Sequence, residues 1–219
     1  MPYEKVESPL CLSALFFQPR KGNLKRPAVF LDRDGVVNQN RADYVKDWSE
    51  VEFLPGAFDA LRRLARTDFA IVLVTNQSVV GRGIISQEEA WDINRRMVET
   101  IRAQGGRVDG AYLCPHHPDE HCECRKPRPG MLLQAADELD LDLGRSYLIG
   151  DAVTDMQAAE AAGVEGILVL TGRGEEQVRE AYPDGPLPWL AVASLDLAVD
   201  HILNTGFSES SAKCNRSSS

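Results

Sequence analysis

Two aspartates separated by one residue directly follow a short apolar run near the start of the chain. Residues 28–31 are apolar and follow Pro27, which predicts a buried strand that ends where Asp32 and Asp34 begin. Ligand sites in open parallel sheets lie beyond the carboxyl ends of the strands. Gly35 permits a sharp turn, so both carboxylates can face one pocket. Because close carboxylates repel each other unless a cation lies between them, and because Mg²⁺ prefers oxygen ligands, the pattern indicates a Mg²⁺ site.

An Asp-rich turn without any function explains that stretch equally well when it is taken alone, because Asp and Gly are common turn residues. Polar residues recur, however, at the ends of two further apolar runs. The run 70–74 is followed by Thr75 and Asn76, and the run 146–150 is followed by Asp151. If the three runs are parallel strands, their polar ends lie at one edge of the sheet.

Three of the five cysteines lie in a short loop that also contains histidines, which indicates a metal site rather than a secreted disulfide framework. Three thiolates and an imidazole form a closed tetrahedral Zn²⁺ site, which has no open position for water and is therefore structural. The ligands that we expect are Cys114, His116, Cys122 and Cys124. His117 or His121 could replace His116, because spacing alone does not select a ligand. The same residues could instead form a reduced, metal-free loop or a strained Cys122–Cys124 disulfide.

The composition is that of an ordinary globular domain of 219 residues, with 43% hydrophobic and 26% charged residues. A formal net charge of −9 argues against nucleic acid or an anionic membrane as the main partner. An anionic substrate would therefore need a locally basic site, which Arg125, Lys126 and Arg128 could supply. The apolar run 10–17 follows acidic residues and is too short to span a membrane, so we expect a cytoplasmic protein without a signal peptide.

Apolar runs alternate with segments of helical periodicity along most of the chain, which implies right-handed crossovers. We therefore expect an α/β fold with a doubly wound, Rossmann-like parallel sheet flanked by helices. The predicted strands are 28–31, 70–74, 110–113, 146–150, 166–170 and 189–193. No large cap domain interrupts the pattern, and such an open site suits a small substrate. The expected boundaries are an N-terminal extension at 1–26 that acts as a solvated tether, a domain at 27–204 with a zinc-binding loop at 114–124, and a Ser-rich disordered tail at 205–219.

The strand-end residues and the intervening stretch 125–127 form a four-part pattern that covers residues 28–170. This set, in this order, resembles the haloacid dehalogenase superfamily of phosphohydrolases, and the combination is far more specific than any one part. The resemblance implies that Asp32 attacks phosphorus and forms an aspartyl-phosphate. It implies that Asp34 first protonates the leaving oxygen and then activates the water that cleaves the intermediate.

The same resemblance implies that Mg²⁺ is held by Asp32, the backbone carbonyl of Asp34, and Asp151. Three groups would neutralise the equatorial phosphate oxygens: the Thr75 hydroxyl, the Asn76 backbone N–H and the Lys126 ammonium. The zinc would immobilise the loop that leads into Lys126, and would thereby fix the position of this catalytic lysine.

Several stretches narrow the resemblance, namely D-R-D-G-V-V-N, T-N-Q-S-x-x-x-R-G, C-P-H-H-P and C-x-C-R-K-P. They resemble the D-glycero-D-manno-heptose 1,7-bisphosphate 7-phosphatase branch, whose neighbour is the histidinol-phosphate phosphatase domain. The expected zinc ligands match a pattern of that branch. The substrate-binding residues implied by position, with Arg125 on the distal phosphate, are Asn40, Tyr44, Thr75, Asn76, Gln77, Ser78, Arg125 and Lys126.

Val79, Val80 and Ala152 depart from the pattern of the branch, which leaves the sugar and its anomer open. We expect a Mg²⁺-dependent phosphatase acting on a small sugar phosphate, with histidinol phosphate or another small metabolite as the alternative substrate. A non-catalytic, zinc-stabilised binding protein is a further alternative, but it would have lost at least one catalytic residue, and none is lost. The expected partner is a small phosphorylated sugar, not a nucleic acid or a membrane, and the expected state is a monomer.

Overall fold

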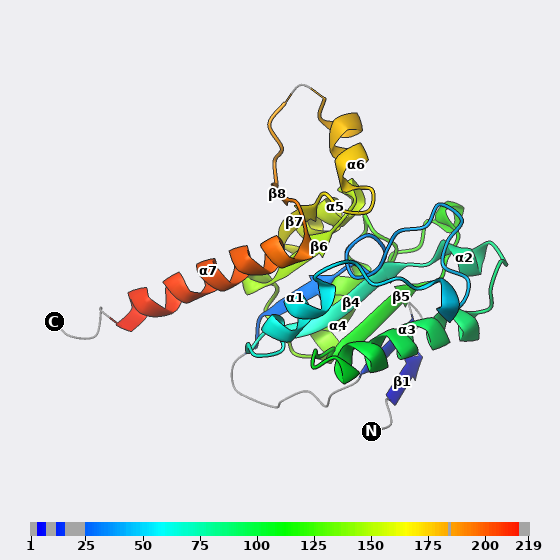
Figure 1. The fold of residues 1–219 in the computed structure, drawn as a ribbon, viewed down its shortest axis with the longest axis horizontal. Coiled ribbons are helices and arrows are strands. Elements are labelled where there is room, and N and C mark those ends of the chain that lie inside the picture. The colour runs from blue at the N-terminus through cyan, green and yellow to red at the C-terminus, as the bar shows by residue number, and fades with distance from the viewer. Residues whose placement is uncertain (1–3, 8–11, 16–24, 184, 215–219) are drawn as a thin grey trace.

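One eight-stranded sheet runs through the protein (Figure 1). The computed structural model describes residues 4–7, 12–15, 25–183 and 185–214, with side-chain surroundings for 25–183 and 185–205. In spatial order the strands are β1 (Glu4–Glu7), β2 (Leu12–Leu15), β5 (Gly110–Cys114), β4 (Ala70–Asn76), β3 (Ala28–Leu31), β6 (Tyr147–Gly150), β7 (Glu165–Val169) and β8 (Leu190–Val192). The last six strands in this order, β5, β4, β3, β6, β7 and β8, are parallel to one another, which confirms the predicted doubly wound α/β fold.

Helices cover both faces of this sheet because successive side chains of a strand point to opposite faces. On one face, α1 (Ala57–Leu64), α3 (Gln87–Ala103) and α7 (Leu195–Cys214) contribute to a core that includes Val29 and Leu31 of β3. On the other face, α4 (Gly130–Glu138) and α5 (Val153–Ala162) surround Phe30 of the same strand. A capping box between Ser86 and Glu89 begins α3.

The register of the central strands brings the predicted site residues to one edge. Leu31 of β3 lies opposite Leu73 of β4 and Ile149 of β6. Asp32 therefore leaves the sheet close to the point where β6 ends. Strand β4 continues further than predicted, because Thr75 and Asn76 still pair with β5. This extra pairing holds their side chains on a rigid element.

The N-terminal segment differs from the solvated tether that was expected. Residues 4–7 and 12–15 pair with each other as an antiparallel hairpin, and β2 adds antiparallel to the edge of β5. Four-residue strands are too short to show a period in the sequence, whereas the unpaired backbone groups of β5 offer them a template. The remaining residues before Lys25 lie outside the described part of the chain.

At the other end, helix α7 continues past the expected boundary at residue 204 and reaches Cys214 (Figure 1). Residues 215–219 of the expected tail lie outside the described part of the chain. The described part of the chain also includes two short helices, α2 (Ser78–Gly81) and α6 (Gly174–Ala181). Within the described residues no domain is inserted into the sheet, and no helix has the length and apolar character that a membrane span requires.

Candidate active site

The turn after β3 is fixed by backbone bonds and by close packing. The Asp32 N–H donates to the carbonyl of Ile149, 2.9 Å away. Gly35 has a φ of 86°, a backbone conformation that residues other than glycine rarely adopt. A Cβ atom at Gly35 would lie 2.1 Å from Oδ2 of Asp151, and one at Gly172 would lie 2.3 Å from the same atom. Two glycines therefore let the loops after β3 and β7 close around the Asp151 carboxylate.

Three buried carboxylates meet at this edge of the sheet. Oxygens of Asp32, Asp151 and Asp155 lie within 4.8 Å of one another. Asp151 is fully buried, and its Oδ1 atom accepts no hydrogen bond from the described residues, while the Arg173 guanidinium lies 3.6 Å away. Burial raises the pKa of Asp32 to about 7, although Lys126 opposes the shift, and the neighbouring carboxylates of Asp155 and Asp151 add to it. A set of oxygen donors with this excess of negative charge fits a divalent cation.

Asp155 belongs to this cluster, although it was not among the residues predicted from the sequence. Asp155 lies in the first turn of α5, is 1% exposed, and accepts a hydrogen bond from the Ala152 N–H at 3.0 Å. Its spacing of four residues from Asp151 was the available signal, because a helix starting between them turns both carboxylates toward the strand ends. The Asp34 carboxylate does not belong to the cluster, so the expected role of Asp34 toward Mg²⁺ is confined to its backbone carbonyl.

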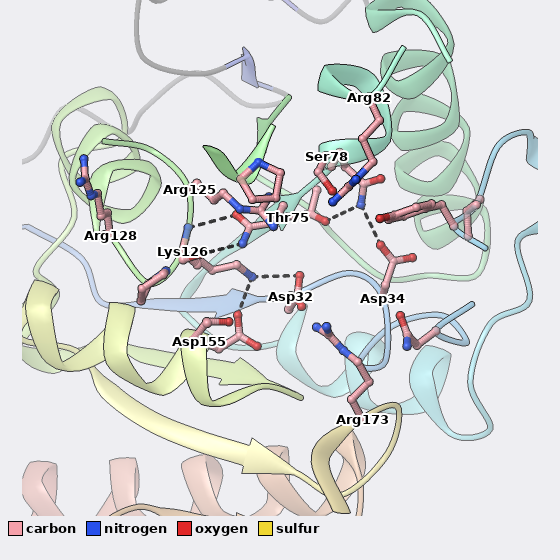
Figure 2. A pocket seen from close by; sticks show the side chains of 18 of the residues that line it. Asp32, Asp34, Thr75, Ser78, Arg82, Arg125, Lys126, Arg128, Asp155 and Arg173 are labelled. Atoms are coloured by element: carbon pink, nitrogen blue, oxygen red, sulfur yellow. Dashed lines mark hydrogen bonds and ion pairs between the residues drawn. The ribbon is translucent and has the colours of Figure 1, made fainter. Parts of the chain in front are cut away.

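Lys126 connects two of these carboxylates (Figure 2). Its Nζ atom lies 3.0 Å from Asp32 and 2.7 Å from Asp155, and it donates to the carbonyl of Val74 at 2.9 Å. Burial alone would lower the pKa of Lys126, but Asp155 and Asp32 outweigh it and raise the pKa. The lysine is therefore a fixed positive charge beside the expected nucleophile.

Asp34 is held separately by three hydrogen-bonding neighbours. Its carboxylate accepts bonds from Arg33, from the Asn38 amide at 2.9 Å and from the Gln77 amide at 2.8 Å. Burial alone would raise the pKa of Asp34, but the Arg33 charge and these bonds outweigh it and lower the pKa. The Gln77 amide also donates to the Thr75 hydroxyl at 2.9 Å, which leaves the hydroxyl proton for another acceptor.

Asn76 joins the second motif to the loop that contains Lys126. The Asn76 side chain accepts from the Lys126 N–H at 3.1 Å and donates to the Lys126 carbonyl at 3.0 Å. This reciprocal pair fixes the backbone at Lys126, a positioning role for the side chain that the sequence analysis did not anticipate.

A cavity of about 680 Å³ opens above these groups. Its lining includes every residue expected to bind substrate, namely Asn40, Tyr44, Thr75, Asn76, Gln77, Ser78, Arg125 and Lys126. Four further arginines, for which no specific contact was predicted, also line the cavity: Arg41, Arg82, Arg128 and Arg173. Several of them surround the opening in Figure 2. The cavity is thus locally basic on an acidic chain, as an anionic substrate requires.

The four expected zinc ligands lie together on one side of the cavity. The Sγ atoms of Cys114 and Cys124 are each 3.6 Å from that of Cys122, and His116 Nδ1 lies 3.5 Å from Cys114 and 3.3 Å from Cys124. Bonds of about 2.3 Å to a tetrahedral zinc place two sulfurs about 3.8 Å apart, which these distances approach. The donor set therefore fits zinc.

The remaining two histidines of this loop have different surroundings. His117 caps a 3-10 helix (Pro118–Glu120) by accepting from the Asp119 N–H at 3.3 Å. His121 lies after that helix in a left-handed conformation and lines the cavity. The geometry therefore supports His116 as the imidazole ligand among the three histidines that spacing could not separate.

Replacing Cys122 by Ser should remove zinc and lower thermal stability together, because a closed site loses one of its four ligands. At about 2–4 °C per kcal/mol for a chain of this size, we expect the melting temperature to fall by at least about 5 °C. Metal analysis and calorimetry measure both effects. The control is Cys214→Ser, at the end of α7, which should change neither. Full zinc content in Cys122→Ser would contradict the ligand set.

Comparison with known proteins is consistent across sequence and structure. A family model described as HAD-hydrolase-like matches residues 123–195. The D-glycero-beta-D-manno-heptose-1,7-bisphosphate 7-phosphatase of Yersinia pestis is 46% identical over 173 residues, which cover 75% of this chain and 92% of that protein. The Escherichia coli K12 protein of the same name is 40% identical over 178 residues, which cover 78% of this chain and 91% of that protein.

The chain is also similar to solved structures of phosphatases. A D,D-heptose 1,7-bisphosphate phosphatase from B. bronchiseptica, complexed with magnesium and phosphate, has a TM-score of 0.76 and 38% identity, covering 82% of this chain and 99% of its own. A putative HAD-like phosphatase from Mesorhizobium loti has a TM-score of 0.73 and 31% identity, covering 92% and 98%. The chain therefore belongs to the HAD-like hydrolases, in the family of the D-glycero-β-D-manno-heptose-1,7-bisphosphate 7-phosphatases.

Proposed function

We propose that the chain is a Mg²⁺-dependent phosphatase that removes the 7-phosphate of D-glycero-β-D-manno-heptose 1,7-bisphosphate, with Asp32 as the nucleophile. The placement of the Lys126 ammonium between Asp32 and Asp155, at the floor of a basic cavity, carries this proposal. The names of the relatives supply the sugar and its β anomer, which the sequence motifs left open.

In the first step a carboxylate oxygen of Asp32 forms a bond to phosphorus as the bond between phosphorus and O7 of the sugar breaks. Asp34 gives its proton to O7, which leaves as a hydroxyl group. In the second step Asp34 takes a proton from water, whose oxygen bonds to phosphorus and releases Asp32 and inorganic phosphate. A bound dianionic phosphate raises the pKa of Asp34, which is lowered in the resting protein, so the proton can be acquired when substrate arrives.

The chain's own cations and donors hold the phosphoryl group. Lys126 supplies a buried positive charge, and the Thr75 hydroxyl has its proton available because its oxygen already accepts from Gln77. The Asn76 backbone N–H is the third donor in the proposal. Asp32, Asp151, Asp155 and the Asp34 carbonyl would hold the Mg²⁺ ion, which neutralises charge between carboxylate and phosphate and lowers the pKa of Asp32.

Arg125 is the proposed contact for the distal phosphate. Its Nη1 atom is buried and has no hydrogen-bond partner among the described residues, although Arg125 lines the cavity. An unpaired guanidinium nitrogen in a cavity is costly unless a ligand pairs with it, and a phosphate is a suitable bidentate acceptor. Asn40 and Tyr44 line the same cavity, where the proposal assigns them to the sugar.

We further propose that the protein acts as a cytoplasmic monomer without nucleic acid or membrane partners. The formal net charge of −9 opposes binding to polyanionic surfaces. The N-terminal hairpin covers the β5 edge of the sheet, where unpaired backbone groups would otherwise offer a pairing site to a second copy.

Asp32→Asn should reduce turnover by at least about 10⁴-fold, because the amide cannot form the covalent intermediate. Phosphate release from the heptose bisphosphate measures the loss, and near-ultraviolet circular dichroism checks the fold. Asp137→Asn, on the exposed surface of α4, is the matched control and should keep full activity. Turnover by Asp32→Asn at the wild-type rate would remove Asp32 as the nucleophile.

Removal of divalent cations should abolish turnover, and added Mg²⁺ should restore it, because the three buried carboxylates repel the phosphate without a cation. Zinc content measured on the same samples separates this effect from loss at the cysteine cluster. Activity that persists in protein shown to be free of magnesium would contradict the proposed role of the cluster.

Arg125→Met should lower kcat/KM for the 1,7-bisphosphate by about 10- to 100-fold, the value of a charge-assisted hydrogen bond to a buried group. The heptose 7-monophosphate lacks the distal phosphate, so its kcat/KM should change little. Steady-state assays of both substrates with both proteins test the contact. An equal loss on the two substrates would show that Arg125 acts elsewhere than on the distal phosphate.

A further inference from the structure

Arg33 lies between the nucleophile and the acid–base residue, and no step of the proposed reaction uses it. Its side chain is 1% exposed and is among the largest fully buried side chains of the described residues. A buried guanidinium is unfavourable unless its charge and donors are satisfied. The contacts of Arg33 therefore indicate why a charged residue occupies this position.

The Arg33 guanidinium binds both oxygens of Asp34. Its Nε and Nη2 atoms donate to Oδ2 at 3.1 and 2.9 Å, and Nη2 also lies 3.2 Å from Oδ1. Such a fork of planar donors fixes the orientation of a carboxylate as well as its distance. Together with the bonds from Asn38 and Gln77, it leaves the Asp34 carboxylate a single orientation.

Arg33 is itself held from a different element of the fold. Its Nη1 atom donates at 3.0 Å to Oδ1 of Asn94, which lies on α3 and is 1% exposed. The Arg33 backbone N–H donates to Oδ1 of Asp32 at 2.7 Å, and its carbonyl accepts from Val37 at 2.9 Å. One residue thus contacts both reacting carboxylates, and helix α3 anchors it.

We propose that Arg33, anchored by Asn94, is a positioning residue that orients the Asp34 carboxylate for proton transfer to the leaving oxygen. The proposal rests on the proposed role of Asp34. A purely structural ion pair makes a different prediction, because its removal affects all substrates alike. Loss of orientation affects only substrates whose leaving group needs a proton.

The experiment compares two leaving groups in Arg33→Met, which keeps the apolar stem. The heptose bisphosphate releases an alkoxide that needs the proton, whereas p-nitrophenyl phosphate releases a weakly basic phenolate that does not. Rapid mixing under single-turnover conditions measures release of the leaving group before the water step. We expect a loss of about 10²-fold or more for the sugar and less than about threefold for the aryl ester.

Two further variants serve as controls for this comparison. Asp34→Asn should show the same discrimination, and if it shows none, the acid role of Asp34 fails and the positioning role that rests on it fails as well. Arg26→Met removes a guanidinium paired with the buried Asp109, just before β3 and β5 begin, and it should lower stability without discrimination. If Asp34→Asn discriminates and Arg33→Met loses both activities equally, or neither, the positioning role is wrong.

If Arg33→Met does not fold, variants of Asn94 test the positioning role instead. Asn94→Leu preserves volume but removes the acceptor of Nη1, and it should slow the sugar about tenfold relative to the aryl ester, the equivalent of one buried hydrogen bond. Asn94→Asp retains the acceptor and should restore the wild-type ratio. Equal ratios in the wild type and Asn94→Leu would overturn the anchoring role.

Discussion

The interaction on which the site depends is the contact of one buried ammonium with two buried carboxylates. Lys126 is 3% exposed, and Asp32 and Asp155 lie 3.0 and 2.7 Å from it. Charges at such burial are tolerated only when they are paired. With Asp151 nearby, however, the negative groups still outnumber the positive one, and burial together with these carboxylates raises the pKa of Asp32 to about 7. The resting site is therefore prepared for a further cation rather than neutral in itself.

Two constraints keep that ammonium in place. Asn76 binds both backbone groups of Lys126 from the end of β4. On the other side, Cys124 precedes Lys126 by two residues and belongs to the cluster that fits zinc. Because Cys114 ends β5 and pairs with Asn76 in the sheet, the sheet, the metal loop and the lysine form one continuous unit. The cluster that fits zinc thus bears directly on the position of Lys126.

Periodicity and the positions of strand ends predicted the sheet and part of the site from the sequence. Strand ends located Asp32, Thr75 and Asp151, because parallel strands align their carboxyl ends. Asp155 was missed because its role depends on where α5 begins, and Asn94 because its partner is sixty-one positions away. Spacing could not choose among three histidines, whereas the position of His116 Nδ1 beside the cysteines favours His116. The hairpin at the β5 edge escaped detection because four-residue strands show no period.

The contact between the loops after β3 and β7 has a consequence for mutational tolerance. A Cβ at Gly172 would lie 2.5 Å from the Cα of Gly35, and a Cβ at either position would strike the same Asp151 oxygen. A larger residue at one position cannot be compensated by a smaller one at the other, because both residues are glycines and glycine has no side chain to shorten. Functional variants of this chain should therefore keep glycine at both positions, even though the two lie 137 positions apart in the sequence.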